Sequence, residues 1–122
     1  MKNGKKNWVF CDGYLPPHGD NPEFEGHEAL MLTNLNHKNA NIELTFLFED
    51  KEPIAGIFID LKGMRTTCVR LDKPLGESKI MLGEAVQYTV WVKSNVPICA
   101  CFGRLDVRQT NMAYYSVEGY SF

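Results

Sequence analysis

The chain has 122 residues and a mass of 13.9 kDa, the size of one domain that folds without disulfide bonds. Hydrophobic residues make up 44% and charged residues 23%, which excludes a disordered chain, a collagen and a coiled coil. The formal net charge of −2 lacks the basic excess needed to bind DNA irrespective of sequence, so we expect no nucleic-acid partner.

Apolar residues alternate with polar ones along most of the chain, with the period of two that is typical of β-strands. In segment 41–49, for example, Ile42, Leu44, Phe46 and Phe48 fall on one face of the strand. The predicted strands, in chain order, are 8–14, 27–34, 41–49, 54–61, 64–71, 86–93, 98–106 and 112–117. Polar turns separate them, and Gly63 is expected to supply a positive φ in the two-residue connection 62–63.

About eight short strands predict an all-β fold, either an antiparallel sandwich or a jelly-roll barrel, that forms a single domain over residues 1–122. Residues 1–6 are expected to be a flexible N-terminus. No apolar run approaches the roughly 20 residues of a membrane helix. The basic start is followed by no signal-peptide core, so the protein is expected to be cytoplasmic.

Segment 98–103 breaks the alternation because it is apolar on both faces. Either it is a central strand covered above and below, or its outer face packs against another subunit. Met31 and Leu47 add surplus apolar positions, which favours oligomerisation. The four cysteines (Cys11, Cys68, Cys99 and Cys101) lie in apolar stretches and are expected to be buried, reduced thiols rather than metal ligands.

Catalysis has little support in the sequence. No G-x-S-x-G elbow, H-E-x-x-H helix or P-loop is present, so we predict no catalytic residues, no metal and no cofactor. His18 and His37 are expected to be solvated loop histidines. His27 opens a strand beside Glu28, and both a structural and a functional role stay open for it.

The segment Arg104-Leu-Asp-Val-Arg108 has the strongest pattern of charges. In an extended chain Arg104, Asp106 and Arg108 share one face, where guanidinium groups bind a carboxylate, a phosphate or a diol. The alternative is a surface ion ladder at the end of a strand. Trp91, with polar neighbours at alternate positions, is either a ligand platform or part of a subunit interface, and the interface is the favoured interpretation.

A series of short motifs spans nearly the whole chain and resembles the sensory rhodopsin transducer family of small prokaryotic proteins. The motifs are Trp8-Val-Phe-Cys-Asp-Gly-Tyr-Leu-Pro-Pro17, His27-Glu28, Asp50-Lys-Glu-Pro53, Arg65-Thr66, Ser94-Asn-Val-Pro97 and Arg104-Leu-Asp-Val-Arg-Gln109. The resemblance implies a jelly-roll-like sandwich that assembles as a homotetramer. It also implies binding of small molecules, carbohydrates among them. For the founding member it implies a membrane sensory receptor as partner and a DNA-binding role.

The resulting hypothesis is a non-catalytic module that binds a small molecule, such as a sugar. Its site would be a polar pocket at one end of the sandwich, formed by Trp8, Tyr14, Glu28, Arg65, Arg104, Asp106 and Arg108. The alternative is a signal transducer that docks on a membrane sensory receptor or regulates transcription through DNA binding.

Overall fold

The computed structural model describes residues 3–109 and 111–122, and within them every regular element is a β-strand. The strands are β1 (Lys5–Tyr14), β2 (His27–Asn34), β3 (Ala40–Phe48), β4 (Ile54–Leu61), β5 (Arg65–Arg70), β6 (Gln87–Asp106), β7 (Ala113–Val117) and β8 (Tyr120–Ser121). All strand pairs are antiparallel. The predicted all-β fold of about eight strands is confirmed.

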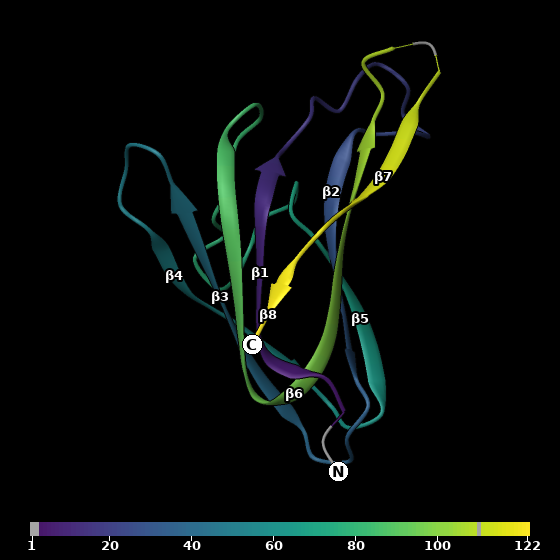
Figure 1. Cartoon of the computed structure of the whole chain (residues 1–122). Helices are drawn as coiled ribbons and strands as arrows, with labels where there is room; N and C mark the ends of the chain where they lie inside the picture. The colour runs from purple at the N-terminus through teal and green to yellow at the C-terminus, as the bar shows by residue number, and fades with distance from the viewer. Residues whose placement is uncertain (1–2, 110) are drawn as a thin grey trace.

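Strand β6 has 20 residues and belongs to both layers of the sandwich. Its first half pairs with β1 and β3, and its second half, from Cys99 onward, pairs with β2 and β7. Sheet A therefore has the order β4-β3-β6-β1-β8, and sheet B has the order β5-β2-β6-β7. Figure 1 shows β6 descending one layer, turning at the bottom of the view and rising in the other. The two separate strands predicted at 86–93 and 98–106 are thus one continuous strand.

The core lies between the inner faces of the two sheets. The alternation predicted for segment 41–49 is confirmed at Ile42, Leu44 and Phe46, which are buried, and Phe48 packs against the core from its margin. Leu30, Leu32 and Phe102 face them from sheet B. The loop after β5 closes the open side, because Leu75 and Leu82 are buried in the same core.

The first strand begins earlier than predicted. Lys5 already pairs with Ile98, so residues 5 and 6 are part of β1 rather than of a flexible N-terminus, and residues 1–2 lie outside the described residues. The reason is the bend of β6, which brings Ile98 beside the start of β1 and extends its ladder of backbone hydrogen bonds.

The connection at residues 62–63 joins β4 of sheet A to β5 of sheet B, and its positive φ falls on Met64 (55°) rather than on Gly63. Gly63 is needed for a different reason. A Cβ atom at this position would lie 2.2 Å from the His37 carbonyl oxygen, so only glycine allows the turns to pack.

The prediction of buried cysteines is wrong. Cys11, Cys68 and Cys101 are exposed free thiols, and Cys99 is half-buried. They lie on the outer faces of the sheets, where the described residues supply no third layer. Segment 98–103 is therefore not covered on both sides by the described part of this chain, and the subunit interface stays a prediction.

Among residues 3–109 and 111–122 no helix has the length and hydropathy to cross a membrane.

Candidate functional site

A buried carboxylate, Glu28, joins the two sheets at the loop end of the sandwich. Glu28 lies at the start of β2 on its inner face and has no exposed surface. Its Oε1 atom accepts a hydrogen bond of 2.5 Å from the hydroxyl group of Tyr88, and its Oε2 atom accepts one of 3.0 Å from the backbone N–H of Tyr14. Both donors belong to sheet A, so this single side chain ties sheet B to sheet A.

The positive partner of Glu28 is Arg104, which lies directly opposite it on β6. The Nε atom of Arg104 donates to Glu28 Oε2 at 2.7 Å, and the side chain of Arg104 is 7% exposed. Its Nη1 donates to the Tyr115 hydroxyl at 3.1 Å, and its Nη2 donates to the Asp12 carbonyl oxygen. We call Glu28, Tyr88, Arg104 and Tyr115, with the backbone of Tyr14, the Glu28 network.

The charge states in this network follow from its geometry. Burial opposes the positive charge of Arg104, but its hydrogen bonds to Tyr115 and Glu28 outweigh burial, so the pKa of Arg104 lies above its usual range. Burial, reinforced by the nearby Glu28 carboxylate, raises the pKa of Tyr88 far above its usual range. Tyr88 therefore keeps its proton and donates it to the hydrogen bond with Glu28.

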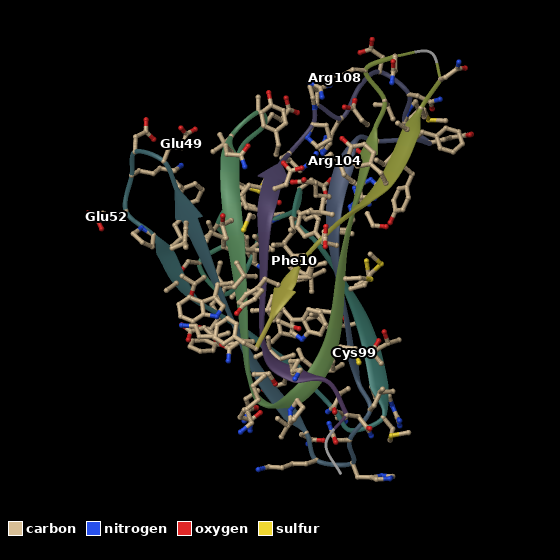
Figure 2. All side chains as sticks on the ribbon, in the orientation of Figure 1. Phe10, Glu49, Glu52, Cys99, Arg104 and Arg108 are labelled. Carbon is tan, nitrogen blue, oxygen red and sulfur yellow. The ribbon has the colours of Figure 1, made fainter. Side chains whose placement is uncertain are left out.

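Above the network lies a more exposed rim, formed by Asp12, Tyr14, Asp106 and Arg108. Arg108 binds Asp106 through two of its nitrogens, with Nη2 2.6 Å from Oδ2, and its guanidinium lies 5.8 Å from the ring centre of Tyr14. The hydrogen bond from Arg108 lowers the pKa of Asp106. The side chains of Arg108 and Asp12 are 52% and 65% exposed. Figure 2 shows Arg104 and Arg108 at the same end of the molecule, with Phe10 deeper between the sheets.

The row predicted for residues 104, 106 and 108 is divided in the structure. Arg104 turns inward and pairs with Glu28, whereas Asp106 pairs with Arg108 outside the core. The simple surface ladder is therefore wrong for Arg104, because the inner face of β6 carries that residue into the sandwich, two positions after the buried Phe102.

The family described as Anabaena sensory rhodopsin transducer matches residues 3–121. The chain belongs to this family. The solved structure of Thermotoga maritima 1070 is 32% identical, with a TM-score of 0.86, over 98% of this chain and 97% of that one. The solved Anabaena sensory rhodopsin transducer is 30% identical, with a TM-score of 0.75, over 88% and 94%. No curated protein matches the chain.

Not all of the residues predicted for the site of this transducer-family protein meet at one end. Tyr14, Glu28, Arg104, Asp106 and Arg108 lie together, as described above. Arg65 is exposed and pairs with Asn34 at the far end of β2, six residues and about 20 Å from Glu28. A shared pocket that includes Arg65 is therefore wrong, because β5 runs antiparallel to β2.

Trp8 also lies away from the network. Its indole N–H donates to the carbonyl oxygen of Ile98 at 3.0 Å, and its ring stacks on Phe10 at a centroid distance of 6.3 Å. These contacts hold the bend of β6 against β1, so Trp8 supports the opposite end of the core.

A second ionic cluster lies at the end of β5 and was missed in the sequence. Arg70 binds the buried carboxylate of Asp72 with two hydrogen bonds of 2.6 Å, and His18 Nε2 lies 2.9 Å from Asp72 Oδ2. Burial works against the charge of Asp72, but the hydrogen bonds from Arg70 prevail and lower its pKa. His18 is a loop histidine whose side chain is 39% exposed, as expected, but it also has a structural contact, because its hydrogen bond to Asp72 holds loop 16–26 against the end of β5.

The described residues form cavities away from the rim. One of about 440 Å³ runs along β4, and two others of about 280 and 180 Å³ lie over β3 and β6. None of their lining residues is Glu28, Arg104 or a rim residue. Within the described residues no cluster of three or more His, Cys, Asp or Glu side chains is arranged to hold a metal ion. Chemically, the site offers a rigid ionic floor beneath a shallow polar rim.

Proposed function

We propose that this member of the transducer family is a non-catalytic module that binds a small polar molecule at the rim above the Glu28 network. The observation that carries the proposal is the position of Asp12, Tyr14 and Arg108, which are accessible and lie over a buried, fully bonded ion pair. A rigid floor of this kind holds rim groups in place at low entropic cost, which favours binding. In this arrangement Glu28 and Arg104 are positioning residues.

The chemistry of the rim suits a molecule with several hydroxyl groups. The Asp12 carboxylate accepts hydrogen bonds from hydroxyl groups, and the spare N–H groups of Arg108 donate to oxygens. The rings of Tyr14 and Tyr115 offer flat apolar faces for a sugar ring. A non-catalytic role is supported by the engagement of the buried charges, since Glu28 already accepts three hydrogen bonds within the protein.

Isothermal titration calorimetry and thermal shift with a panel of neutral monosaccharides and sugar phosphates test this proposal. At least one probe should raise the melting temperature, and Arg108→Ala should abolish that shift without lowering the melting temperature of the free protein, because Arg108 is exposed. Arg65→Ala, an exposed arginine at the opposite end, is the matched control and should change neither quantity. A panel without a binding probe, or a shift that survives Arg108→Ala, would overturn the proposal.

A second candidate function is docking on a membrane sensory receptor. Its support is the name of the solved Anabaena relative, a sensory rhodopsin transducer that is 30% identical to this chain. Titration with Anabaena sensory rhodopsin in lipid nanodiscs should then give saturable binding, whereas empty nanodiscs should not bind. With a net charge of −2, the protein should not retard a DNA fragment at physiological salt.

We also propose that the module works in the cytoplasm as a homotetramer. The exposed free thiols support a reducing compartment. Assembly is supported by the two outer sheet faces. That of sheet A carries Leu47 (39% exposed) and the half-buried Trp91, and that of sheet B carries Met31, Cys99 and Cys101. Two different outward faces with apolar residues on one chain suit a tetramer with two-fold axes.

A further inference from the structure

Strand β4 forms an open edge of sheet A. It pairs with β3 along one side, and within the described residues no strand pairs with its other side. Within the residues that the structure describes, no turn or loop forms a backbone–backbone hydrogen bond with residues 54–61. Figure 1 shows β4 at the outer margin of its layer. An edge of this kind carries unpaired N–H and C=O groups that can accept another strand.

A groove runs beside this edge. Its volume is about 440 Å³, and its opposite wall is the loop that follows β5. The lining residues are Ile54, Ala55, Gly56, Ile57, Phe58 and Asp60 of β4, and Leu75, Gly76, Glu77, Ser78 and Ile80 of the loop. Gly76 of the loop lies against the side chain of Ile57, and its positive φ of 70° favours glycine at this position. The groove therefore combines apolar walls with a strand edge that no second strand pairs. Side chains bind two backbone groups of β4, since Glu43 accepts from the Gly56 N–H and Asn34 donates to the Leu61 carbonyl oxygen.

The charged side chains that line the groove are all acidic. Asp60 and Glu77 are exposed, they form no ion pair within the described residues, and no lysine or arginine lines the groove. Phe58, which is 70% exposed, presents an aromatic face that attracts a guanidinium group. A second copy of β4 is a poor occupant, because it would bring the same carboxylates against these.

We propose that the free edge of β4 binds an extended segment of another protein in which apolar and basic side chains alternate. The segment adds to sheet A as a further strand through backbone hydrogen bonds. Its apolar side chains pack against Ile54 and Ile57, and its basic side chains meet Asp60 and Glu77. This inference rests on residues distinct from the rim and stands independently of the proposed ligand.

The probe is a fluorescein-labelled seven-residue peptide that alternates valine and arginine, titrated into the full chain with anisotropy as readout. We expect saturable binding with one site per chain, together with slower hydrogen exchange at residues 54–61. The double variant Asp60→Asn/Glu77→Gln should weaken binding at least tenfold. Asp20→Asn/Glu23→Gln, which removes two exposed carboxylates from loop 16–26, is the matched control and should bind as the natural protein does.

Two further peptides separate strand addition from simple charge attraction. Each is N-methylated at alternate residues, one at the valines and one at the arginines, so that only one keeps the N–H groups that face β4. The peptide that keeps the N–H groups facing β4 should bind, and the peptide in which these groups are methylated should lose binding. The proposal is overturned if both bind equally, if argininamide alone binds as tightly, or if the probe does not saturate at millimolar concentration. It is also overturned if residues 54–61 are protected without peptide in a concentration-dependent manner, since a second copy then fills the edge.

Discussion

At the scale of single residues, the Glu28 carboxylate makes the contacts that matter most. It is buried, it accepts three hydrogen bonds, and it neutralises Arg104 across adjacent strands. The position of Glu28 in its motif drew attention in the sequence, but its partner could not be predicted. Glu28 and Arg104 are 76 residues apart, and only the register between β2 and β6 brings them together.

Glu28→Gln should lower the free energy of unfolding by about 3–5 kcal/mol, because Arg104 would stay buried without its counter-charge. Urea denaturation monitored by tryptophan fluorescence measures this loss. Glu118→Gln, an exposed carboxylate near the C-terminus, is the control and should stay within about 0.5 kcal/mol of the natural protein. A loss below about 1 kcal/mol at Glu28 would contradict the structural role assigned to the pair.

The Asp72 cluster predicts that the stability of the protein depends on pH in the acidic range. The pKa of Asp72 in the folded chain lies below its ordinary value of 3.8, so its contribution to stability is complete above about pH 5. That contribution is lost as the pH falls from 3.8 toward the lowered pKa of the folded state. The difference in unfolding free energy between the natural protein and Asp72→Asn should thus be constant above pH 5 and shrink below 3.8. Asp20→Asn should show no such trend, and a difference that grew in acid would refute the assignment.

At the scale of elements, the alternation of apolar residues is sufficient to predict most strands. The main error is the division of β6 into two strands, and it falls where the alternation was not followed. Val92, Ser94, Val96 and Ile98 are all buried, so the period of two continues through the Ser94-Asn-Val-Pro97 motif that was interpreted as a break. The two-residue strand β8 left no pattern to detect. Tyr88 falls on the apolar face of the predicted strand 86–93, and because a buried tyrosine hydroxyl needs a hydrogen-bond partner, its position could have indicated the network.

The pairing of β1 with β6 depends on a close approach at Gly13. A Cβ atom at Gly13 would lie 2.5 Å from the Tyr88 ring, which cannot retreat because its hydroxyl binds Glu28 and its ring packs against Phe46. Gly13→Ala should therefore cost about 1–3 kcal/mol of stability in thermal or urea unfolding. Gly103→Ala is the matched control. A Cβ atom at Gly103 would clash with the hydroxyl end of Tyr114, but this side chain is exposed and can move away. Equal losses at the two glycines would show that the Tyr88 ring is not fixed.

At the scale of the whole molecule, the two uncovered outer faces predict assembly. Light scattering at micromolar concentration should give a mass of about four times 13.9 kDa. Trp91→Asp should reduce that mass, because an unpaired charge would have to be buried at the sheet A face. Phe24→Asp, which places the same charge at an exposed aromatic residue of loop 16–26, should leave it unchanged. A mass near 13.9 kDa for the natural protein would overturn the assembly.

The long strand β6 also determines when the protein can fold during its synthesis. It supplies a central strand to both sheets, so among the described residues that precede it the named strands form two pairs, β3–β4 and β2–β5. Two-stranded pairs of this kind have little stability on their own. Neither layer can close until Asp106 has left the ribosome, and the nascent chain must keep the five preceding strands from pairing wrongly until then. A chaperone that binds extended segments would therefore bind the nascent chain before β6 is complete rather than the folded protein.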